Sequence, residues 1–89
     1  MNGMDRTNLL SVAETTLTQV HDNRLLAPVR SLVKALKRET PSHAEIVVCV
    51  TRLMKLFRRY DPKATFGSEA HQDTENFKAL IDVILTMSI

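Results

Sequence analysis

The residue types that most often carry chemistry are few and scattered in this chain. Its three histidines, His21, His43 and His71, lie far apart, and none is followed at helical spacing by a second histidine or a cysteine. Cys49 is the only cysteine, so it cannot assemble the four-ligand Cys and His sets of structural zinc sites. The sequence therefore predicts no metal site and no bound cofactor.

Two short combinations have the residue types of acid–base pairs. His71 and Asp73 are separated by one residue in a stretch where we expect a loop, and ordinary surface polar residues often have this arrangement. Ser42 precedes His43, but a helix start explains the serine without a catalytic role. With two glycines in the whole chain, a glycine-rich phosphate loop is not possible either. We therefore expect that the protein is not an enzyme.

Length and composition indicate one folded domain over residues 1–89. Apolar residues make up 44% and charged residues 25%, which is typical of globular rather than disordered chains. No stretch approaches the ~18 consecutive apolar residues of a membrane span, and residues 1–5 lack the pattern of a signal peptide. Cys49, expected to be a small buried hydrophobe rather than a reactive thiol, fits a reducing compartment, so we expect a cytoplasmic protein.

The spacing of apolar residues predicts an all-α fold, a small four-helix bundle-like domain. Leu9, Ala13, Leu17 and Val20 recur at intervals of four, four and three residues, which places them on one face of a helix. Apolar residues over 29–36 and 77–85 fit the same template. We predict helices over residues 7–21, 24–38, 42–60 and 74–88. Residues 1–6 are expected to form a loose tail, and residues 61–73 a loop.

Polar residues with short side chains predict where these helices begin. Each helix has two candidate capping residues, which are Thr7 or Asp5, Asn23 or Asp22, Thr40 or Ser42, and Asp73 or Thr74. Glu45 follows Ser42 at the spacing of a capping box. The third helix is expected to end at Asp61, because the residue before a proline avoids helical geometry. In the loop that follows, Phe66 is the one large apolar side chain, and we expect it to contact the core.

The third helix contains the most apolar run of the chain, residues 46–50. Its β-branched residues also suit a β-strand, but no second strand-like run exists to pair with it, which favours a helix. Because this run has no polar side, we expect it to be buried on nearly all sides as part of a central third helix. Apolar surface at one end of this helix and at the C-terminus then predicts a homodimer or a contact with another helical protein. The residues expected in that contact are Val47, Val50, Met54, Met87 and Ile89.

Charge is unevenly distributed although the net charge is only +2. Residues 24–63 carry ten Lys or Arg and three acids, a local charge of +7, while residues 1–23 carry −2 and residues 64–89 carry −3. Most of these basic residues form a stripe on the second and third helices. Its members are Arg30, Lys34, Lys37, Arg38, Arg52, Lys55, Arg58, Arg59 and Lys63. Such a stripe fits an acidic protein surface or nucleic acid, although solvated faces neutralised by neighbouring acids give the same pattern.

These features together predict a protein-binding module, such as a regulator, adaptor, inhibitor or chaperone, that acts through helix surfaces. Nucleic-acid binding through the basic stripe is the alternative. Tyr60 is the one aromatic residue within that stripe, so base stacking is poorly served. A helix-turn-helix over residues 29–60 is disfavoured, because residues 46–50 would place an apolar segment where a recognition helix contacts base edges.

Overall fold

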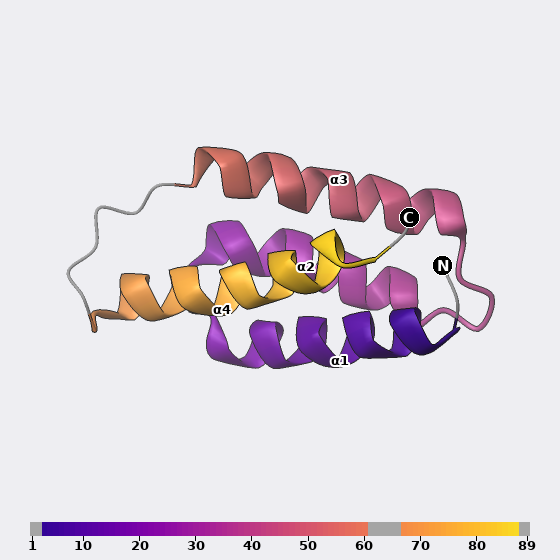
Figure 1. Ribbon diagram of the computed structural model, residues 1–89, viewed down its shortest axis with the longest axis horizontal. Coiled ribbons are helices and arrows are strands. Elements are labelled where there is room, and N and C mark those ends of the chain that lie inside the picture. Colours follow the sequence, from indigo (N-terminus) through magenta and orange to yellow (C-terminus); the bar gives the residue numbers. More distant parts are fainter. Residues whose placement is uncertain (1–2, 61–66, 88–89) are drawn as a thin grey trace.

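The protein is all-α throughout the part of the chain that its computed structural model describes, residues 3–60 and 67–87 (Figure 1). The four helices are α1 (Gly3–Gln19), α2 (Asn23–Leu36), α3 (His43–Arg59) and α4 (Glu69–Leu85). They run alternately up and down, and α1 and α3 each pack against both α2 and α4 (Figure 1). The predicted four-helix bundle is thus confirmed. None of these helices combines the length and apolar character needed to cross a membrane.

Helix caps account for three of the four helix starts. Asp22 precedes α2 and its carboxylate accepts a hydrogen bond from the Arg24 N–H at 2.9 Å. Ser42 precedes α3 and its hydroxyl accepts from the Glu45 N–H at 3.3 Å. Each accepted bond satisfies one of the backbone donors that the first turn of a helix leaves unpaired. Of the two candidates at each position, Asp22 and Ser42 are therefore the caps.

Two of the predicted helix boundaries are wrong. Residues 3–6, expected in a loose tail, belong to α1. Residues 69–73, expected in a loop, form the first turns of α4, because the Ser68 hydroxyl caps that helix and accepts from the His71 N–H at 3.2 Å. Gly67, with φ at 83°, sets the backbone direction just before this cap. Lys63 and Phe66 lie outside the described residues.

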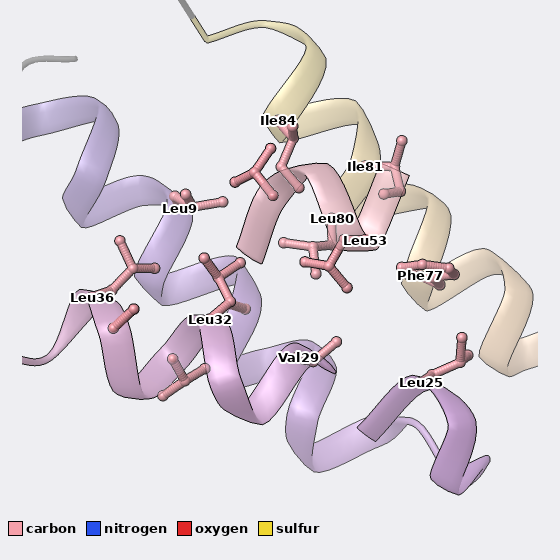
Figure 2. Packing of buried hydrophobic residues seen from close by; sticks show 14 of the residues in the cluster. Leu9, Leu25, Val29, Leu32, Leu36, Leu53, Phe77, Leu80, Ile81 and Ile84 are labelled. Atoms are coloured by element: carbon pink, nitrogen blue, oxygen red, sulfur yellow. The ribbon is translucent and has the colours of Figure 1, made fainter. Parts of the chain in front are cut away.

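All four helices contribute apolar side chains to one core (Figure 2). Phe77, Leu9, Leu25, Leu32, Leu53 and Leu80 are among the largest side chains that are fully buried there. The Phe57 and Phe77 rings meet edge to face, with centroids 5.6 Å apart, an arrangement that aromatic pairs prefer. This contact joins the last turns of α3 to the middle of α4.

The prediction that the apolar run at residues 46–50 is buried on nearly all sides is wrong. Ile46 and Val50 lie in the core, at 1% and 7% exposure, but Val48 is 61% exposed. The reason is that α3 packs mainly against α2 and α4, so the side facing away from both is left exposed within the described part of the chain. The third helix therefore has a solvent-facing side that is apolar near its N-terminus.

Asp73 is a buried acid that joins α4 to the turn between α1 and α2. Its side chain is 2% exposed, and its two carboxylate oxygens accept the backbone N–H groups of His21 at 3.0 Å and Asp22 at 2.9 Å. The His21 Nδ1 lies 3.1 Å from the same carboxylate. The prediction that Asp73 or Thr74 caps α4 is therefore wrong. Ser68 is the cap, and the partners of Asp73 are the backbone donors of the α1–α2 turn.

Asp22 continues this connection to α3. It forms two-pronged hydrogen bonds with the Arg24 guanidinium, the shortest at 2.7 Å, and it accepts the Tyr60 hydroxyl at 3.1 Å. These contacts hold the pKa of Asp22 at about 2, chiefly because of the Arg24 hydrogen bonds. The turn before α2, the start of α2 and the end of α3 are thus held by two neighbouring carboxylates.

Replacing Asp73 by Ala is expected to destabilise the fold by about 2 kcal/mol or more, because two backbone donors of the turn lose their acceptor. The matched control is Asp82→Ala, an exposed acid on the same helix, expected to change stability by less than about 0.5 kcal/mol. Urea unfolding followed by circular dichroism measures both. Equal losses in the two variants would show that the contacts of Asp73 contribute little.

The Asp73 carboxylate raises the pKa of His21 in the folded protein, chiefly by hydrogen bonding. Protonated His21 therefore stabilises the folded state at pH values below 6.5, its ordinary pKa, and this contribution is lost as the pH rises through the folded-state pKa. Measurements at roughly pH 6 and pH 8.5 lie on the two sides of this titration. We expect urea unfolding to give a larger stability difference between the wild type and His21→Gln at the lower of these pH values. A difference that stays constant with pH would contradict this assignment.

Candidate functional site

A cavity of about 790 Å³ opens along the solvent-facing side of α3 where this helix faces the beginning of α2. We call it the α2–α3 groove. Apolar and cationic side chains form most of its wall, and no acid is among its described lining residues. The lining residues are Arg24, Pro28, Val47, Val48, Thr51, Arg52, Lys55, Leu56, Arg59 and Tyr60.

The apolar part of the α2–α3 groove includes surface that water reaches in the isolated chain. In the described part of the chain two large apolar side chains are exposed. They are Val48 and, on α4, Leu85 at 63%. Val47 and Leu56 are half-buried, and Pro28, within α2, is buried. Uncovered apolar side chains beside a concavity are typical of a surface that a partner covers.

Three cations of α3 share the wall of this groove. Arg52, Lys55 and Arg59 are all exposed. They are spaced by three and four residues, so they lie on one side of the helix. Within residues 3–60 and 67–87, none of them has an acidic partner within ion-pair distance. Their charge is therefore available to a ligand without displacing an internal partner.

Arg24 and Tyr60 close the end of the groove and are held in place by Asp22. The Arg24 guanidinium lies over the Tyr60 ring, 5.3 Å from its centroid, while the Tyr60 hydroxyl donates to Asp22. The same ring meets Phe77 edge to face at 6.1 Å. Burial and the hydrogen bond to Asp22 raise the pKa of Tyr60, so its hydroxyl remains a donor at neutral pH. The ring is therefore engaged within the fold and not presented for stacking.

The structure separates the predicted basic stripe into groups. Arg52, Lys55 and Arg59 line the groove, whereas Arg58 is exposed beside them without lining it. Arg30 and Lys34 are exposed on α2, also outside the lining.

Two further members of the stripe form ion pairs with acids of the same chain. Lys37 lies 3.1 Å from a carboxylate oxygen of Glu14, and Arg38 lies 2.9 Å from one of Glu45. Both pairs are largely exposed, where an ion pair contributes roughly 0–1 kcal/mol. They nevertheless place acids next to these cations, so the unpaired positive charge is concentrated at the other end of α3.

Of the apolar residues predicted to meet a partner, Val47 lines the groove. Val50 belongs to the core and offers a partner almost no surface. Met54 and Met87 are half-buried and pack against the core, and Ile89 lies outside the described residues.

The sequence analysis did not assign Val48, Leu56, Pro28, Arg24 and Tyr60 to the site. The amphipathic pattern of α3 would have placed Val48 among the basic side chains, four residues before Arg52. No sequence pattern places Arg24 next to Tyr60, because their contact depends on how α2 and α3 pack. Thr51 was not assigned either, so six of the ten described lining residues were missed, and the contribution of α2 in particular depends on tertiary structure.

The candidate catalytic pair does not form in the described part of the chain. The carboxylate of Asp73 is taken up by His21 and the α1–α2 turn, and no three His, Cys, Asp or Glu residues described here lie together as a metal site would require. Cys49 is half-buried and burial raises the pKa of its thiol, which disfavours the reactive thiolate. Comparisons with protein-family models, curated proteins and solved structures give no match. The function must therefore be inferred from the chemistry of the α2–α3 groove.

Two valines of α3 provide a test of this description. Val50→Asp is expected to destabilise the fold by about 3 kcal/mol or more, because it places a carboxylate in the core. Val48→Asp, two residues away, is expected to change stability by less than about 0.5 kcal/mol, because the side chain is exposed. Thermal unfolding measures both. A large loss for Val48→Asp would mean that this side of α3 is covered.

Proposed function

We propose that this protein is a non-enzymatic binding module that contacts another protein through the α2–α3 groove. The observation that carries the proposal is the combination of exposed apolar surface at Val48 with three neighbouring cations that have no acidic partner within residues 3–60 and 67–87. Apolar surface supplies affinity through burial, and cations supply specificity for an acidic surface. A regulator, adaptor, inhibitor or chaperone acts through such a surface without chemistry of its own.

The same observations make a different protein a better partner than a second copy of the chain. The predicted homodimer rested on apolar surface left uncovered on the third helix and at the C-terminus, and the exposed Val48 is such surface for either kind of partner. Two copies joined groove to groove would also bring Arg52, Lys55 and Arg59 of both onto one interface, and like charges oppose each other there. We therefore propose an acidic protein as the partner, acting on a chain that is monomeric when alone.

Charge-matched variants test the proposed function. The groove variant carries Glu in place of Arg52, Lys55 and Arg59. The control variant carries Glu in place of Arg30, Lys34 and Lys78, which are exposed and outside the groove, so both lose the same charge.

Peptides are selected from a random displayed library on the wild-type chain and then measured on both variants. We expect the selected peptides to bind the control variant as they bind the wild type, and to bind the groove variant at least about tenfold more weakly, since three exposed ion pairs are lost. If the selected peptides bind both variants equally, the groove is not the binding site. Light scattering of the chain alone tests whether it is a monomer. A stable dimer would contradict the proposed monomer and support the homodimer predicted from the sequence.

Nucleic-acid binding is the second candidate, favoured by the unpaired cations of α3. For three phosphate contacts, binding to a generic DNA duplex would fall roughly fortyfold between about 50 and 200 mM salt. The exposed Val48 and the engaged ring of Tyr60 support protein binding instead, since neither serves phosphate or base recognition. A strong, salt-sensitive mobility shift with the wild type, lost in the groove variant, would favour nucleic acid.

A further inference from the structure

We propose that the segment which occupies the α2–α3 groove is an acidic amphipathic helix, with apolar side chains toward Val48 and carboxylates toward Arg52, Lys55 and Arg59. This inference rests on the proposed function and specifies the chemistry of its partner. It follows from three properties of the groove, which are the secondary structure around it, the order of its side chains along α3, and the readiness of its charges.

The surrounding secondary structure favours a helix over other bound segments. An extended peptide binds by adding a strand to a sheet edge, and the described residues contain no strand. A polyproline segment requires a groove lined by aromatic rings, and Tyr60 is the one aromatic residue in this lining, already covered by Arg24. A helix, by contrast, packs into the furrow between two helices by the same ridge-and-groove geometry that builds the bundle.

The order of side chains along α3 indicates which end of the bound helix is apolar and which end is acidic. Val47 and Val48 stand at the N-terminal end of the lining, and Arg52, Lys55 and Arg59 follow toward its C-terminal end. At ~1.5 Å per residue, the three cations are spread over about 10 Å of the helix. Carboxylates spaced by three or four residues on a neighbouring helix repeat at the same interval. An occupant that is apolar at one end and acidic at the other therefore matches the groove along its length.

The cationic end of the groove is prepared for an anion before a partner arrives. Arg24 is held by Asp22 and by the Tyr60 ring, so its charge is balanced within the fold and it shapes the end of the groove. Arg52, Lys55 and Arg59 have no acidic partner among the described residues that a ligand would need to displace. The absence of a competing partner lowers the cost of binding a carboxylate to these three cations. An acidic occupant gains more from this arrangement than a neutral one.

Synthetic peptides of about 18 residues, long enough to span α3, test the proposal. The acidic probe places leucines over the first half of one helical face and glutamates over the second half. Three companions isolate its features: a scrambled peptide of the same composition, a version with two central prolines, and a version with lysine in place of each glutamate. Binding to the full chain is measured by fluorescence anisotropy, with inorganic phosphate as a competitor.

We expect the acidic probe to bind the wild type and the control variant equally. The scrambled, proline and lysine peptides are expected to bind about tenfold more weakly or not at all, because each loses the apolar face, the helix or the charge match. The groove variant should lose the acidic probe and gain the lysine peptide, which is a reversal that a misfolded variant cannot give. Val48→Asp should weaken the acidic probe while leaving the melting temperature unchanged.

Different failures identify different errors. If the scrambled or proline peptide binds as well as the acidic probe, the groove attracts charge without recognising a helix, and the inference is overturned. Displacement by phosphate at millimolar concentration would overturn it in favour of a phosphorylated ligand. If the displayed library yields groove-dependent peptides that are not acidic helices, the proposed function stands and only this inference fails. If no peptide from either source depends on the groove, both fail.

Discussion

The buried carboxylate of Asp73 is the interaction on which the arrangement of this bundle depends. It accepts the two backbone donors of the α1–α2 turn that no helix pairs, and it does so from α4, which is 51 or more residues further along the chain. A buried acid is costly unless hydrogen bonds surround it, and this one has two backbone donors within 3.0 Å and the His21 Nδ1 at 3.1 Å. The α1–α2 turn then places Asp22 where it holds Arg24 and Tyr60 at the end of the groove.

Stability and the candidate binding surface are therefore linked in one end of the molecule. The apolar core defines which faces of the helices pack, but it does not determine how Arg24 lies relative to Tyr60. The carboxylate of Asp22 does, because it contacts both side chains. A change at Asp73 is thus expected to reach the groove through the turn, even though Asp73 is not part of the lining. The hydrogen bonds of Asp73 and Asp22 thus both stabilise the fold and position Arg24 and Tyr60 in the groove.

The sequence was sufficient for the fold and for part of the site. Leu9, Ala13 and Val20 repeat at helical intervals, and all three are in the core, because local periodicity reports which face a helix buries. The sequence was insufficient where a residue's role depends on a distant segment. Asp73 resembles a helix cap locally, yet its partners lie in the α1–α2 turn. Val48 belongs to an apolar run, and only the placement of α2 and α4 around α3 leaves it exposed.

The separation of charge between helices has a consequence for how fast a partner is captured. The exposed cations of the groove lie on α3, whereas α4 carries exposed acids at Glu69, Glu75 and Asp82 beside one exposed cation, Lys78, so positive charge is concentrated at the groove. Such a charge distribution attracts an approaching anionic surface and raises the association rate. In the proposed complex, the apolar contact at Val48 forms only after the two surfaces meet, so it bears on dissociation rather than on capture. Ionic strength should therefore change the rate of capture more than the lifetime of the complex.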